Sequence, residues 1–126
     1  MRTRNSLLLV ALFFIFTSLG SSVIAQTKVV RANQYPGADL GAKVNAADKA
    51  LGSGAGEIVL SGGGRISTQI VISGNHTLRL ERGTYSATTA LPPILLKPGS
   101  KLIGPANWEA IILESTAPNQ FTVISA

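Results

Sequence analysis

The chain has 126 residues, a formal net charge of +5 and no cysteine. This charge surplus is modest and no cluster of lysine and arginine is interleaved with aromatic side chains, so we expect no nucleic-acid partner. The lack of cysteine excludes a disulfide scaffold and favours a fold held by the packing of regular, stacked strands.

Residues 1–25 have the pattern of a secretory signal peptide. Arg2 and Arg4 precede an apolar run over residues 7–19, and the small residue Ala25 suits cleavage by a signal peptidase. The run is short for a membrane span. We therefore expect a secreted protein, extracellular or periplasmic, with no membrane association after cleavage; an uncleaved N-terminal anchor is the alternative. Cleavage would leave 101 residues and lower the formal charge to +3.

A lead-in and a helix are predicted next. Residues 26–37 are largely polar and end in the turn Pro36-Gly37, which predicts an extended lead-in. Asp39 is placed to cap a helix that runs to about Leu51. The apolar residues of this helix fall on one stripe, formed by Leu40, Val44, Ala47 and Leu51. We expect the helix to cover another element, and we assign residues 38–126 to one unit that contains it.

The stretch Gln69–Pro105 repeats itself with an offset of 24 residues. Ile70–Ile72 fall on Ile94–Leu96, and the two-residue corner between the apolar runs repeats as well. Asn75 and Gly99 occupy the corner position best able to adopt a positive φ. A fixed period of this size is typical of a solenoid, in which each unit buries its apolar face against its neighbours.

The repeat places the strands in coils of three. The first coil would use Glu57–Ser61, Gln69–Ser73 and His76–Glu81, and the second Thr84–Thr88, Pro93–Lys97 and Ser100–Gly104. A third would begin with Glu109–Glu114 and Gln120–Ser125. Three short strands per coil suit a parallel β-helix, because each strand pairs with strands one coil above and below.

Two glycine-rich segments, Gly52–Gly56 and Gly62–Gly64, are predicted to be turns. A phosphate-binding glycine loop follows a strand and opens a helix, whereas the order around the first segment is helix, glycines, strand. We therefore predict no phosphate site in either segment and no cofactor in this part of the protein.

Four segments together resemble the start of a pectate-lyase superfamily β-helix: Tyr35–Lys43, Gly54–Leu60, Leu102–Gly104 and Ile111–Leu113. The resemblance implies a mainly β fold, a right-handed parallel β-helix of which this chain holds the first two to three coils, with an N-terminal amphipathic capping helix. It also implies a secreted protein that acts on polysaccharide as a lyase or glycoside hydrolase. Calcium would then be expected in the full-length protein.

Two other interpretations remain open at this stage. The first is a non-catalytic extracellular β-helix for glycan binding, adhesion or surface structure, and the second is a truncated fragment without independent function. Residues 120–126 read as an apolar strand with no polar cap. Since a solenoid must cover its terminal coil, we expect further coils, which would hold the catalytic groups, or a partner at this end.

The sequence supplies no convincing catalytic or metal-binding set. Glycoside hydrolysis generally needs two neighbouring carboxyl groups, and calcium needs several clustered ones. Glu57 and Glu109 fall at matching starts of the first and third coils, but solvated strand ends explain them equally well. Asp48 is predicted to be solvated on the helix. We assign no catalytic residue and no metal ligand.

Three residues are candidates for contact with a glycan. Arg79 and Lys101 lie one position apart on the repeated third strand and would meet an acidic sugar, although strand alternation alone accounts for an outward Arg79. Trp108 would stack on a sugar ring or pack under a corner. His76, the single histidine, is predicted to be a turn residue because it follows the corner Gly74-Asn75.

Overall fold

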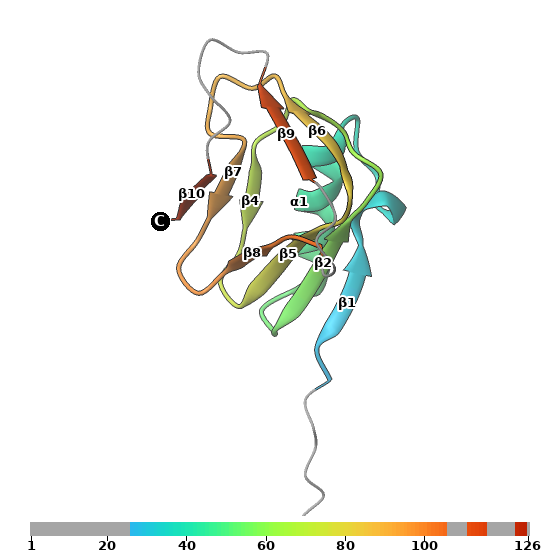
Figure 1. Cartoon of the computed structure of the whole chain (residues 1–126). Helices are drawn as coiled ribbons and strands as arrows, with labels where there is room; N and C mark the ends of the chain where they lie inside the picture. The colour runs from blue at the N-terminus through green and yellow to red at the C-terminus, as the bar shows by residue number, and fades with distance from the viewer. Residues whose placement is uncertain (1–25, 106–110, 116–122, 126) are drawn as a thin grey trace, which may run out of the picture.

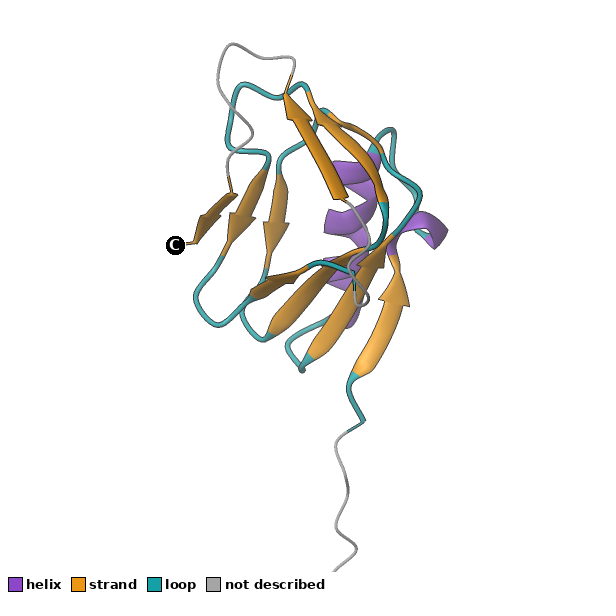
Figure 2. Ribbon diagram, in the orientation of Figure 1, coloured by secondary structure: helices purple, strands orange, loops and turns teal. Residues whose placement is uncertain are grey.

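The computed structural model describes residues 26–105, 111–115 and 123–125. The predicted signal peptide and Trp108 lie outside these ranges. The described part of the chain is mainly β, with strands in three parallel sheets, one α-helix and one short 3-10 helix (Figures 1 and 2).

The helices are η1 (Ala32–Gln34) and α1 (Leu40–Leu51). The strands are β1 (Lys28–Arg31), β2 (Gly56–Leu60), β3 (Gly64–Ile66), β4 (Ile70–Ile72), β5 (His76–Leu80), β6 (Gly83–Ala87), β7 (Ile94–Leu96), β8 (Lys101–Ile103), β9 (Ile111–Ser115) and β10 (Val123–Ser125). They form the sheets β1-β2-β5-β8, β4-β7-β10 and β3-β6-β9. From β2 onward the chain visits the three sheets in a fixed rotation.

The 24-residue repeat is confirmed as a strand register. Ile70 lies opposite Ile94 and Ile72 opposite Leu96, as the sequence echo predicts. The corner prediction is also confirmed, because Asn75 has a φ of 67° and Gly99 a φ of 84°. The two corners stack, and the N–H of Asn75 donates to the carbonyl of Gly99 at 3.3 Å.

The predicted composition of the first coil is wrong. The structure pairs β2 with β5, whereas the sequence interpretation aligned it with β6. The true partner of β6 is β3, a strand that begins at Gly64, the last residue of the predicted turn Gly62–Gly64. β3 was hidden because it is short and follows Gly62 and Gly63, which turn the chain with φ values of 84° and 66°.

Two further predictions change with this correction. Glu57 lies in β2, whereas β9 belongs to a different sheet, so the first strands assigned to the first and third coils do not share one face. Glu109 itself lies outside the described residues. The lead-in is not merely extended: its residues 28–31 form β1, which pairs with β2 in parallel. Neither the β1–β2 pairing nor the β2–β5 pairing is visible in the sequence, because the paired residues are 20 or more positions apart.

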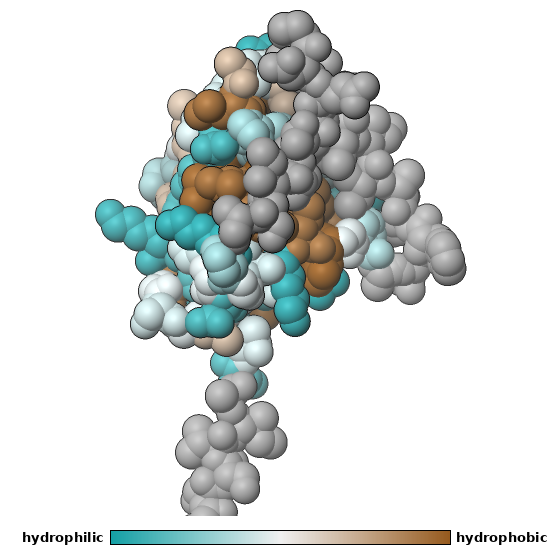
Figure 3. Space-filling model, turned by 90° about the vertical axis from the view of Figure 1, so that its left-hand side faces the viewer, coloured by the Kyte–Doolittle hydropathy of each residue, from teal (hydrophilic) through white to brown (hydrophobic). Residues whose placement is uncertain are grey.

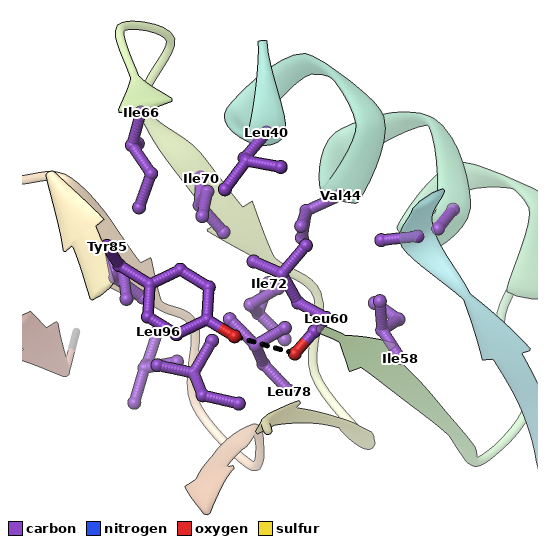
Figure 4. Close-up of a cluster of buried hydrophobic side chains, with 14 residues drawn as sticks. Leu40, Val44, Ile58, Leu60, Ile66, Ile70, Ile72, Leu78, Tyr85 and Leu96 are labelled. Carbon is purple, nitrogen blue, oxygen red and sulfur yellow. Dashed lines mark hydrogen bonds between the residues drawn. The ribbon is translucent and has the colours of Figure 1, made fainter. Parts of the chain in front are cut away.

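The core lies between the three sheets and α1 (Figure 4). Strands alternate inward and outward side chains, so β2, β5 and β7 each send aliphatic residues to the interior. The helix stripe packs there as predicted, with Leu51 only half-buried. The fully or nearly buried hydrophobic residues include Leu40, Val44, Ala47, Ile58, Leu60, Ile66, Ile70, Ile72, Leu78, Tyr85, Ile94 and Leu96.

Helix α1 packs against β1, β2, β3 and β4. Asp39 caps it as predicted, accepting from the N–H groups of Gly41 and Ala42, and Gly52 ends it with a φ of 77°. The cap Asp39 and the helix side chains Asn45 and Asp48 also bond to the backbone of residues 67–73, from just before β4 to the residue after it. The helix therefore supplies hydrogen-bond partners to backbone groups on one edge of β4, which would otherwise be open to another strand.

Large apolar side chains in the described part are mostly interior, and the exposed exceptions are Val29 and Leu91. Figure 3 views the molecule from the side of β7 and β10, where brown apolar residues gather among teal hydrophilic ones. None of the described helices is long and apolar enough to cross a membrane.

Candidate glycan-binding face

The outer surface of the β1-β2-β5-β8 sheet brings together residues from four strands. Strand register and alternation place two rows of side chains on this surface. The first row is Val29, Glu57, Thr77 and Lys101, and the second is Arg31, Val59, Arg79 and Ile103. We call these eight residues the basic face, because three of them are cationic and one is acidic.

Arg79 and Glu57 form an ion pair across the basic face. The Arg79 Nε donates to Glu57 Oε1 at 2.7 Å, and Nη2 donates to Oε2 at 3.1 Å. The hydrogen bonds from Arg79 hold the pKa of Glu57 below its usual range, and the same contact raises the pKa of Arg79. The side chain of Arg79 is 32% exposed and that of Glu57 is 21% exposed, so solvent screens the pair.

Two cations of the basic face have no acidic partner in the described part of the chain. Arg31 and Lys101 are exposed, and the ion pairs among the described residues involve other groups. Val59 lies between Arg31 and Arg79 in its row and is only 5% exposed although it points outward.

A hollow of about 410 Å³ opens at the amino-terminal ends of the same strands. Its lining is polar or backbone for the most part and consists of Thr27, Ala55, Gly56, Asn75, Thr77, Gly99 and Lys101. Thr77 and Lys101 belong to the basic face as well, so hollow and face are continuous. A polar depression beside the unpaired cation Lys101 suits a hydroxylated, negatively charged ligand better than an apolar one.

The predicted contacts Arg79 and Lys101 therefore lie on one surface. They are two register positions apart and not one as predicted, since Lys101 is opposite Thr77 and Arg79 is opposite Ile103. Arg31 was missed because the lead-in carried no strand pattern, and only its pairing with β2 brings it to this surface.

His76 closes the predicted turn, because its N–H donates to the carbonyl oxygen of Ser73 at 3.2 Å, and it also opens β5. The prediction of a solvated Asp48 is wrong. The two side chains are buried, with exposed fractions of 1% and 7%. His76 Nδ1 lies 2.7 Å from Asp48 Oδ1, and Nε2 lies 3.0 Å from the carbonyl oxygen of Gly54. The hydroxyl of Ser73 bonds to Asp48 rather than to His76, so the three side chains are not arranged as a nucleophile, a base and an orienting acid.

Most acids of the described part are engaged in structural contacts. Asp39 caps α1, Asp48 pairs with His76, and Glu57 pairs with Arg79. No group of three or more histidine, cysteine or acidic residues that could hold a metal ion occurs among the described residues. The basic face, rather than a carboxylate cluster, is therefore the candidate site in this part of the chain.

Comparisons of the chain with models of protein families, with curated proteins and with solved structures found no match.

Proposed function

We propose that the three sheets are the faces of a right-handed parallel β-helix, and that the chain forms the N-terminal part of a secreted, pectate-lyase-like protein acting on polysaccharide. The observation that carries the fold proposal is the rotation of the chain through the three sheets. One circuit leads from Gly56 to His76, its partner in β5, and the next from Thr77 to Lys101 in β8. Parallel pairing of each strand with the strand one circuit later is what a coil requires.

For the described part we propose binding of an acidic polysaccharide on the basic face. Arg31 and Lys101 offer cations that no described acid neutralises, and uronate carboxylates are the matching groups on a glycan. The hollow beside Lys101 would take sugar hydroxyl groups through Asn75, Thr77 and backbone atoms. Trp108 remains a predicted stacking contact, outside the described residues.

The engagement of Asp39, Asp48 and Glu57 specifically favours the non-catalytic alternative for this part of the protein, as a glycan-binding or surface module. Cleavage of the polysaccharide, as a lyase or glycoside hydrolase, would need acids that are not committed to structural pairs. Binding without release of new chain ends would support the alternative. Appearance of unsaturated or reducing ends would support the enzyme.

Calorimetric titration of the purified chain with oligogalacturonate and with a neutral dextran oligosaccharide tests the binding proposal. We expect binding of the acidic oligomer only, weakened by salt, and weakened further in Arg31→Gln and Lys101→Gln. Lys49→Gln is the matched control, because Lys49 is an exposed cation in the last turn of α1, away from the basic face. Equal loss in Lys49→Gln and Lys101→Gln, or no preference for the acidic oligomer, would overturn the proposal.

A further inference from the structure

The buried cluster of Asp48, Ser73, His76 and the Gly54 carbonyl joins the end of α1 to the corner between β4 and β5. Asp48 lies in the helix, Ser73 follows β4, and His76 opens β5. Asp48 Oδ1 accepts from the backbone N–H of Ser73 at 3.0 Å, and Oδ2 accepts from its hydroxyl at 2.6 Å. Four chain segments therefore meet at one carboxylate and one imidazole ring.

The partners of the ring determine how many protons it carries. Nε2 faces a carbonyl oxygen, which can only accept, so Nε2 must carry a proton. Nδ1 faces a carboxylate oxygen that already accepts the Ser73 N–H, so this nitrogen must donate as well. A neutral imidazole has one donor and one acceptor, and either tautomer would set a lone pair against an acceptor in the interior.

We propose that His76 carries both ring protons in the folded protein and acts as a latch that fastens the end of α1 to the β4–β5 corner. A neutral ring in this setting would leave a buried negative charge and a ring nitrogen without a partner. This proposal is independent of the proposed glycan binding.

Few other charged groups lie near the latch. His76 follows Lys28 and Gly56 in one row of the sheet, and the Lys28 ammonium donates to the carbonyl of Ala50, in the last turn of α1, at 3.2 Å. Among the described residues, Asp48 is the only charged group paired with the ring. The Asp48 carboxylate therefore governs the second proton, and Lys28 fastens the same end of the helix separately.

The protonation of the ring can be measured directly, because His76 is the single histidine of the chain. Long-range ¹⁵N–¹H correlation spectra of the folded protein at about pH 7.5 should show two protonated ring nitrogens, whereas the urea-unfolded chain should show a neutral ring at the same pH. A single protonated nitrogen in the folded protein would overturn the proposal.

Hydrogen exchange tests the mechanical part of the latch. The Ser73 amide bonds to Asp48, whereas the Val71 amide bonds to Asn45 of the same helix, outside the cluster. After correction for intrinsic exchange, we expect protection of Ser73 to fall about tenfold in His76→Gln, which lacks the doubly donating ring, with Val71 unchanged. Ser73→Ala should retain the doubly protonated ring. An equal response of both amides would contradict the latch.

Discussion

Asn45 of α1 bonds to Val71 of β4 as a neighbouring strand would. Its side-chain oxygen accepts from the Val71 N–H at 2.9 Å, and its side-chain nitrogen donates to the carbonyl of Gln69 at 2.8 Å. In a parallel ladder, a residue opposite Ile70 bonds to these same two groups. The carboxamide thus replaces a peptide group on one edge of β4, while β7 pairs with the other edge.

Replacement of Asn45 by leucine should therefore destabilise the fold by about 2 kcal/mol, because two backbone groups in a partly buried setting lose their partners. The open edge should also make the variant prone to self-association. Urea denaturation and light scattering measure the two effects. Asn33→Ala is the control: it removes one exposed bond, from Asn33 to the carbonyl of Ser61, and should cost well under about 1 kcal/mol. Equal costs for the two variants would contradict the edge-capping role.

Asp39 should make the fold sensitive to acid. Burial opposes its ionisation, but hydrogen bonds from Thr68, Ser67 and Ala42 outweigh that effect and hold the pKa of Asp39 well below its usual range. A carboxyl with a lowered pKa in the folded state contributes stability above its unfolded pKa, and this contribution disappears as the pH falls through the folded value. Stability should therefore decline below about pH 4.

Asp39→Asn should cost about 2 kcal/mol at neutral pH, the upper part of the range for a helix cap, and should flatten the acid side of the stability profile. Denaturation curves at about pH 7 and about pH 3 test this expectation. Glu81→Gln removes a carboxylate that caps no described backbone group, so it should leave the profile unchanged. A profile that Asp39→Asn does not alter would disprove the assignment.

Local signals in the sequence predicted a good part of this structure. The cap at Asp39, the stripe of α1 and the positive φ of Asn75 each depend on residues within a few positions, and each is confirmed. The 24-residue echo also predicted the β4–β7 register, because the paired strands have similar apolar residues. Residue propensities and apolar periodicity are sufficient to predict such features.

The missed features depend on distant contacts. β3 has only three residues and follows two glycines. Residues 28–31 form the strand β1 only through their pairing with β2. His76 followed a turn in sequence, yet a carboxylate from α1, 28 positions away, compensates its burial. No local pattern reports such a partner, so the burial of Asp48 and His76 and the position of Arg31 required the fold itself.

Tyr85 links two sides of the core through its hydroxyl. The hydroxyl oxygen lies 2.9 Å from the carbonyl oxygen of Leu60 and 2.7 Å from that of Glu81, so its single proton is shared between these two acceptors, and the side chain is fully buried (Figure 4 shows the Leu60 bond). Tyr85→Phe keeps the ring but removes these bonds, so we expect a loss of about 1 to 2 kcal/mol by urea denaturation near neutral pH. Tyr35→Phe is the control, because that ring packs at the margin of the core.

The same burial makes Tyr85 sensitive to alkali. Burial raises the pKa of the Tyr85 phenol, so the folded state favours the neutral form. The stability that this provides is complete below the unfolded pKa, near 10, and is lost as the pH rises above it. Between neutral pH and about pH 10.5, the free energy of unfolding should therefore fall more in the parent chain than in Tyr85→Phe, as measured by urea denaturation. An equal loss in both chains would show that Tyr85 does not ionise on unfolding.

Gly41 and Gly54 should respond oppositely to alanine. Gly41 lies in α1, where alanine normally stabilises a helix, but a Cβ there would overlap the carbonyl oxygen of Thr68. Because that oxygen is backbone and cannot swing away, Gly41→Ala should cost about 2 kcal/mol through displacement of the helix. A Cβ at Gly54 would meet nothing within 4 Å, so Gly54→Ala should be neutral or should stabilise by about 0.5 kcal/mol. Thermal denaturation of both variants decides the matter: if Gly41→Ala is as stable as Gly54→Ala, then α1 does not pack closely against Thr68.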